Sequence, residues 1–203
     1  MAERVRGLLR FLSERLAAEA ASLASTPRTY ACTTTEDLTK NATDAAALLA
    51  QRARALHLLS PLDADPKHAA PCIVDFDKAA QTYAAHARAL LAALGGPLRQ
   101  LATPRAAHVL ASASRLLAKM SVAEARAPDV GVLESSIESL SSIPVTSADA
   151  VCELLTPIAA LLRDALVEFD LGVDAALNGW ELDVDVLSQG DEQKDGKEED
   201  EEE

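Results

Sequence analysis

Apolar residues recur at steps of three and four along almost the whole chain, the spacing that places side chains on one face of an α-helix. Breaks rich in proline, glycine or hydroxyl residues separate these stripes, as expected where helices start and stop. The first four stripes are Val5, Leu8, Leu12, Leu16 and Leu23; Leu38, Ala42, Ala45, Leu49, Ala53 and Leu56; Phe76, Ala80, Tyr83, Ala87, Leu90 and Leu94; and Ala106, Val109, Ala113, Leu116 and Met120. A short fifth stripe holds Val130, Leu133, Ile137 and Leu140, and the last holds Val151, Leu154, Ile158, Leu161, Ala165 and Phe169.

Helix-capping residues set the expected boundaries of the second, third and fourth helices. Residues 33–37 (Thr-Thr-Thr-Glu-Asp) contain two overlapping capping boxes, Thr33 with Glu36 and Thr34 with Asp37. The three prolines in residues 61–71 predict a loop there. Gly95-Gly96-Pro97 predicts a helix end, and a turn through Leu98 and Leu101 then leads to Thr103-Pro104, a cap followed by proline at the first helical position.

The last stripe has its own start and a proline inside it. Ile143-Pro144 closes the short fifth helix, and Ser147 is the expected N-cap of the last one. Pro157 lacks an N–H, so it predicts a kink, or a restart of the helix with Thr156 as the cap. We expect this helix to fray past Gly172.

Amphipathic helices joined by short loops predict an antiparallel, up-down bundle of about five helices. The fold class is therefore all-α, with one bundle domain over residues 1–180. Composition agrees, because 49% of the residues are apolar and only 3% are aromatic. Alanine is abundant on the stripes, which favours close approach of the helices.

The charge is unevenly distributed. The formal net charge is −13, and residues 191–203 contribute −7 of it. Residues 181–203 first alternate acids with aliphatics and then become a run of charge, so we predict an acidic, disordered tail or linker.

Charge and hydropathy also limit the partners and the compartment. An acidic chain is repelled by phosphate backbones, so we expect no direct nucleic-acid binding. Arginines at positions 4, 6, 10 and 15 are interleaved with glutamates and predict a solvated helix face. No stretch approaches 18 apolar residues, and the first 24 residues lack the apolar core of a secretory signal, which predicts a soluble, intracellular protein without a membrane span. Three widely spaced cysteines (Cys32, Cys72 and Cys152) predict free, mostly buried thiols, with Cys152 a small core residue.

The side chains that carry chemistry form no recognisable constellation. The four histidines have no metal-ligand spacing with one another or with the cysteines, so we predict no metal site; they are His57, His68, His86 and His108. Gly95-Gly96 lacks the lysine and hydroxyl of a phosphate-binding loop. No Ser-His-Asp arrangement follows from residue order. The serines in residues 135–142 and the pair Glu134 and Glu138 predict solvated helix faces. We expect no catalytic residue and no cofactor, and therefore no enzyme.

One block of the sequence resembles the cyclin-D-binding protein family, also described as helix-loop-helix-like cyclin-D-interacting proteins. It comprises residues 140–147 (Leu-Ser-Ser-Ile-Pro-Val-Thr-Ser), Thr156 and residues 162–169 (Leu-Arg-Asp-Ala-Leu-Val-Glu-Phe). The family pattern there is a short helix ending in Ile-Pro, a capping residue and a long helix with Val-Lys-Asp-Ala-x-x-Glu-Met. Residues 98–101 and Leu116-Leu117 match more weakly, and the acidic stretch after Trp180 is similar to the linker that follows the family's N-terminal half. Ser147 stands where Asn is usual, and Pro157 is unexpected in the long helix.

The resemblance implies a non-catalytic protein-interaction module that regulates the cell cycle and transcription. Its partners would be cyclin-D-like or helix-loop-helix regulatory proteins in cytoplasm and nucleus, through a fold related to vinculin-like bundles. It transfers no partner-binding residue. The helix pattern alone leaves two alternatives open: a structural adaptor of the vinculin or catenin kind, and a chaperone of basic proteins that uses the acidic tail.

Overall fold

The computed structural model describes residues 2–28, 34–61, 63–144 and 146–188. These residues form six α-helices and one short 3₁₀ helix, and no strand occurs among them. The elements are α1 (Ala2–Ser22), η1 (Leu23–Ser25), α2 (Thr35–Leu59), α3 (Pro66–Ala93), α4 (Gly96–Ser121), α5 (Ala127–Ser141) and α6 (Ser147–Ser188). The predicted all-α class is confirmed.

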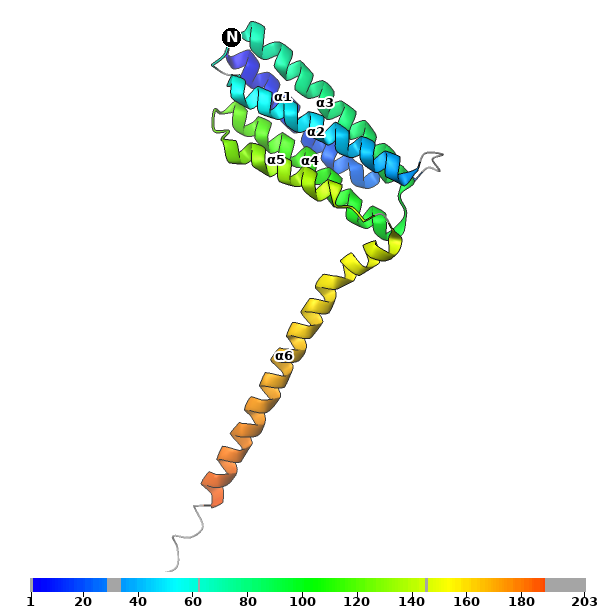
Figure 1. The fold of residues 1–203 in the computed structure, drawn as a ribbon. Helices are drawn as coiled ribbons and strands as arrows, with labels where there is room; N and C mark the ends of the chain where they lie inside the picture. The colour runs from blue at the N-terminus through cyan, green and yellow to red at the C-terminus, as the bar shows by residue number, and fades with distance from the viewer. Residues whose placement is uncertain (1, 29–33, 62, 145, 189–203) are drawn as a thin grey trace, which may run out of the picture. The chain divides into compact units, whose positions relative to one another are not determined.

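Helices α1 to α5 form an antiparallel bundle, and successive helices run in opposite directions (Figure 1). Helix α1 packs mainly against α4, α2 packs mainly against α3, and α5 lies against both α4 and α2. Short connections between amphipathic helices produce this arrangement. The predicted up-down bundle of about five helices is therefore confirmed.

The chain divides into two compact units, Met1–Leu154 and Leu155–Glu203. The first unit holds the five-helix bundle and the first two turns of α6, and the second holds the rest of α6. Helix α6 extends to Ser188, so it includes residues 181–188, which the sequence pattern assigned to the tail. Residues 189–203 lie outside the described part of the chain.

The bundle core consists of the predicted stripes of the second, third and fourth helices. Every residue of these three stripes is buried. Alanines occupy much of the interior, and nine of them on α2, α3 and α4 have no exposed surface: Ala42, Ala46, Ala53, Ala69, Ala80, Ala87, Ala102, Ala106 and Ala113. Their small side chains let the helix backbones approach closely, in agreement with the sequence pattern.

The α1 stripe differs from its prediction by one residue. Leu9 is completely buried, whereas Leu8 is 39% exposed. The buried series Val5, Leu9, Leu12 and Leu16 has the regular four-three-four spacing of a helix face. Two adjacent leucines are equally apolar, and only packing against α4 and α3 distinguishes them.

Polar groups inside the bundle form hydrogen bonds across helix pairs. The Tyr83 hydroxyl on α3 donates to the Ala106 carbonyl of α4 at 3.0 Å, and burial raises the pKa of this phenol far above its ordinary value. Ser13 on α1 and Ser114 on α4 each donate to the other's backbone carbonyl, at 3.0 and 2.9 Å. These bonds remove most of the cost of burying hydroxyls and fix the register of α4 against its neighbours.

The loop predicted over residues 61–71 is shorter than expected, because α3 begins at Pro66. The Asp65 carboxylate accepts a hydrogen bond from the Lys67 N–H at 2.9 Å and caps the helix. Pro66 occupies the first turn, where an N–H has no intrahelical partner, and Pro71 lies inside the helix. Burial of Ala69 and Ile73 offsets the hydrogen bond that Pro71 cannot make.

The predicted start of the fourth helix at Thr103-Pro104 is wrong, because α4 begins at Gly96 and runs through Pro104. Gly96 has a φ of +50°, a conformation that favours glycine. The Thr103 hydroxyl donates to the Arg99 carbonyl at 2.8 Å instead of capping a helix. Leu98 and Ala102 are buried and extend the apolar stripe toward the N-terminus, so tertiary packing outweighs the local capping pattern.

Ion pairs tie α5 to the bundle surface. Glu134 of α5 pairs with Arg54 of α2, and Asp129 of α5 pairs with Lys119 of α4. The hydrogen bond from Arg54 lowers the pKa of Glu134, and the hydrogen bonds from Lys119 and the Arg126 backbone lower the pKa of Asp129. Glu134 is therefore not the free, solvated carboxylate that the sequence predicted.

These two carboxylates predict a loss of stability in acid. In the folded protein the pKa values of Glu134 and Asp129 are below the ordinary values of 4.5 and 3.8. Their ion pairs therefore contribute to the free energy of unfolding above those ordinary values. This contribution is lost as the pH falls through the folded-state pKa values. The double variant E134Q/D129N should lose stability less steeply than the wild type below pH 4.5. Urea midpoints measured across this range test it. Both pairs reach solvent, so about 1 M NaCl should reduce the difference, and identical pH profiles would contradict the prediction.

Candidate functional site

The start of α6 is anchored to the bundle. The Thr146 hydroxyl accepts a hydrogen bond from the Asp149 N–H at 3.1 Å, so the N-cap is Thr146 and not the predicted Ser147. Ala150 is completely buried, and Glu153 pairs with Arg105 of α4. These contacts hold the first two turns of α6, up to Leu154, within the bundle unit.

Helix α6 continues through Pro157 without interruption, so the predicted restart with Thr156 as N-cap is wrong. Proline cannot donate a hydrogen bond to the carbonyl four residues earlier, which here belongs to Glu153. The boundary between the two compact units, after Leu154, lies beside this missing bond.

Beyond Leu154, α6 carries a continuous row of exposed apolar side chains. Leu161 is 69% exposed and Phe169 is 67% exposed, against less than 10% for the stripes of α2, α3 and α4. We call this row the α6 stripe; it consists of Leu155, Ile158, Leu161, Leu162, Leu166, Phe169 and Val173. The sequence predicted that the last stripe is buried, and this is wrong: Val151 is already 39% exposed, Leu154 is half-buried, and the stripe members beyond residue 154 are exposed.

The α6 stripe is wide and has acidic borders. At 3.6 residues per turn, its members project within an arc of about 140°. Glu168 projects beside Leu161 at one edge of the arc, and Asp170 projects beside Leu166 at the other. Val167 and Leu171 are also exposed but project from the opposite side of the helix. Residues 155–174 contain four acidic residues and one basic residue, Arg163.

A row of exposed apolar side chains such as the α6 stripe is typical of a surface that binds another molecule. Single exposed apolar residues are common on protein surfaces, whereas contiguous apolar patches with polar borders mark interaction sites. The α6 stripe can bind another apolar helix surface, and it contains no group suited to acid–base or nucleophilic chemistry. We therefore treat it as the candidate functional site. Its periodicity was visible in the sequence, but its exposure was not.

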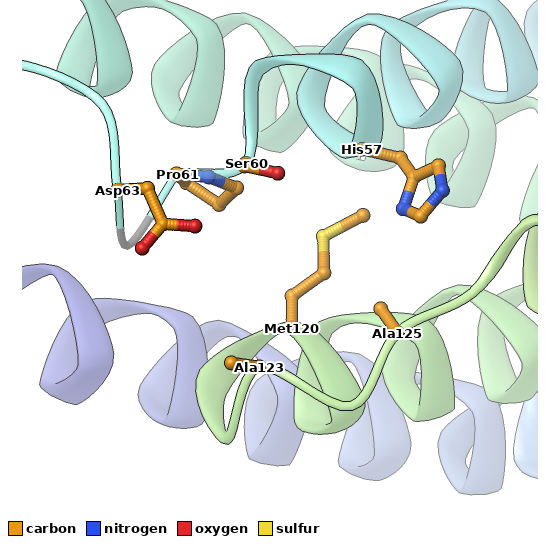
Figure 2. Close-up of a pocket in the computed structure, with 7 residues that line it drawn as sticks. All are labelled: His57, Ser60, Pro61, Asp63, Met120, Ala123 and Ala125. Carbon is orange, nitrogen blue, oxygen red and sulfur yellow. The ribbon is translucent and has the colours of Figure 1, made fainter.

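A second candidate is a small hollow of about 90 Å³ where α2 and α4 end, lined by His57, Ser60, Asp63 and Met120 among others. Figure 2 shows the Met120 side chain reaching into the space between His57 and Ser60. The tertiary fold thus brings a serine, a histidine and an aspartate to one place, which residue order alone did not suggest. No hydrogen bond joins these three side chains to one another among the described residues, whereas a catalytic relay depends on such bonds.

Two residues beside this hollow have positive φ angles, and helix termination explains both. Ser60 (φ 47°) is the C-cap of α2. Ala123 (φ 60°) follows α4, where its N–H donates to the Met120 carbonyl at 3.2 Å and the Glu124 N–H donates to the Lys119 carbonyl at 2.9 Å. This is the Schellman arrangement, with alanine at the position that glycine usually occupies. The backbone conformation here therefore indicates two helix ends.

The remaining residues of chemical interest are dispersed. In the described part of the chain, no group of three or more His, Cys, Asp or Glu residues could hold a metal ion. Cys72 is half-buried and Cys152 is exposed, neither forms a disulfide, and the predicted core position of Cys152 is wrong. Cys32 lies outside the described residues. Ser136 is buried and hydrogen-bonded to Ser112 at 2.9 Å, so it is not on the predicted polar face of α5.

The basic residues of α1 do not form a free anion track. Arg6 pairs with Glu3, and Arg15 pairs with Asp77 of α3. Arg88 of α3 pairs with Glu19 across the same α1–α3 groove. Of the four arginines predicted to form a solvated helix face, Arg4 and Arg10 are exposed, whereas Arg6 and Arg15 are half-buried and form these ion pairs.

No family model, curated protein or solved structure matches the chain. The resemblance to the cyclin-D-binding family therefore stays a prediction. Among the described residues, no helix is long and apolar enough to cross a membrane.

Proposed function

We propose that this protein is a non-catalytic protein-interaction module and that the α6 stripe is its docking surface. The observation that supports the proposal is the row of seven large apolar side chains exposed along one side of α6. Covering such a side chain contributes about 1.5–3 kcal/mol. A partner that covers several of them gains enough free energy to bind specifically.

A cyclin-D-like regulator is the proposed partner. Residues 162–169, which carry most of the resemblance to the cyclin-D-binding family, lie on α6 and include three members of the stripe: Leu162, Leu166 and Phe169. The resemblance and the exposed surface thus point to the same residues. Regulation of the cell cycle and transcription, in cytoplasm and nucleus, is part of this proposal.

The test measures binding of purified cyclin D to the full chain and to two matched variants. L162E/L166E places two carboxylates in the stripe and should weaken binding at least about 100-fold, because two leucine contacts are lost. V167E/L171E makes the same chemical change on the opposite side of α6 and should bind like the wild type. Equal weakening by both variants, or no binding of cyclin D by the wild type at low salt, would refute the cyclin proposal.

The two alternatives give different results in parallel assays. A vinculin- or catenin-like adaptor would bind actin filaments or an amphipathic target helix without binding cyclin D. An acidic chaperone would bind histones through residues 191–203, and deletion of these residues would abolish that binding. Unchanged histone binding after the deletion would end the chaperone hypothesis.

A further inference from the structure

The width of the α6 stripe bears on the shape of its partner. In a two-stranded coiled coil, the buried seam is a narrow row of residues at alternating three- and four-residue steps. The α6 stripe contains such a row, Leu155, Ile158, Leu162 and Phe169, but apolar residues also flank it on both sides. A single partner helix covers the central row and leaves Leu161 and Leu166 at the edges in water.

An apolar arc of about 140° matches the face that a helix turns toward two neighbours in a bundle. The bundle in this protein gives an internal example. Helix α4 lies against both α1 and α5, and apolar or small buried residues cover a broad part of its surface: Ala102, Ala106, Val109, Leu110, Ala113, Leu116 and Leu117. The α6 stripe has a similar breadth, and its side chains are exposed.

The charged residues beside the α6 stripe indicate which residues should border the partner's binding surface. Glu168 and Asp170 border the two edges of the stripe, and Asp164 and Asp174 add negative charge on the outer side. Arg163 projects beside Asp170 and pairs with Asp164 at 3.6 Å, so the charge around the stripe is negative on balance. A partner with Lys and Arg beside its apolar groove meets these carboxylates favourably. A second copy of this chain is a less favourable partner. Its α6 has the same carboxylates at its edges, which would repel those of the first copy, and a single helix covers only part of the arc.

We infer that the α6 stripe inserts into an apolar groove between two helices of a different protein, a groove bordered by Lys and Arg. This inference rests on the proposed function and specifies the partner's architecture and charge. In effect, α6 supplies the third helix of a bundle whose other two helices belong to the partner.

The probe is a designed hairpin of two amphipathic helices with lysine and arginine along its apolar groove. One control is the same hairpin with glutamate at those positions, and the other is a single helix with the basic sequence. Fluorescence anisotropy with the full chain measures binding at about 50 mM and about 300 mM salt. The basic hairpin should bind at least about tenfold more tightly than either control at low salt, and its advantage over the acidic hairpin should shrink at high salt. L162E/L166E should lose this binding and V167E/L171E should keep it.

If the acidic hairpin binds as tightly as the basic one, the partner's groove is not bordered by Lys and Arg. If the single helix binds as tightly as the basic hairpin, the partner does not need two helices. No binding of the basic hairpin, or a concentration-dependent dimer in sedimentation that the hairpin does not dissociate, would overturn the inference as a whole. These results are separate from the cyclin test. If the chain binds the hairpin but not cyclin D, the inference about the partner's groove holds and the cyclin proposal is refuted. If it binds cyclin D but not the hairpin, only the inference about the groove is refuted.

Discussion

Replacing Leu90 with alanine should lower the free energy of unfolding by about 2–5 kcal/mol. Leu90 lies on α3, has no exposed surface and belongs to the most regular apolar stripe of the sequence. The shorter side chain leaves a cavity that close-packed neighbours fill only in part, so packing contacts are lost together with the transfer free energy. Urea unfolding monitored by circular dichroism measures the change.

Leu58→Ala is the matched control, because it is the same substitution at a leucine that is 83% exposed on α2. It should change the free energy of unfolding by less than about 0.5 kcal/mol. A Leu90→Ala effect as small as that of the control would mean that α3 turns a different face toward the core. Because Leu90 and the α6 stripe belong to different compact units, this variant should also leave the exposed stripe unchanged.

Hydrogen exchange should differ by several orders of magnitude between the bundle and α6. Amides of α3 between Ala80 and Leu90 exchange only when the bundle opens, so they should be protected at least about 10⁴-fold for a domain of ordinary stability. Amides from Ile158 to Val173 belong to a helix whose apolar side faces water. Isolated helices of this length are marginal in water, so these amides should be protected about tenfold or less. Exchange followed by NMR or mass spectrometry resolves the two segments.

This measurement tests the exposure on which both proposals depend. Addition of the basic hairpin or of a true partner should raise protection in residues 158–173 and leave the bundle unchanged. Protection near 10³-fold in the chain alone, independent of protein concentration, would show that its own bundle covers the stripe. Protection that increases with protein concentration would show self-association instead.

The core residues of the bundle were predictable because the residues that recur at helical spacing are the same residues that are buried. Ala53, for example, lies between two arginines in sequence, whereas the apolar residues at positions 49, 50 and 56 are buried with it, and only one packing face satisfies that pattern. The choice between Leu8 and Leu9 was not predictable, since two consecutive leucines fit a stripe equally well. The partner helices decide which one is covered.

Helix ends were predictable where capping and burial agree, and not where they compete. The Thr34 hydroxyl accepts the Asp37 N–H at 3.2 Å, so this cap was predicted correctly, whereas Thr33 lies outside the described residues. At Thr103-Pro104 the local pattern favours a helix start, but burial of Leu98 and Ala102 extends α4 through the proline. The free energy of burial is larger than that of a single cap.

By itself, the sequence determined the all-α class, the up-down order of the helices and most of the core, because these follow from the spacing of apolar residues and the positions of helix breakers. It also determined that the last helix is amphipathic and acidic. Only the tertiary structure decided which apolar stripes are covered, and in it Leu161, Leu162 and Phe169 are exposed. The spacing of apolar residues defines a helix face, but it does not say whether another helix is present to cover that face.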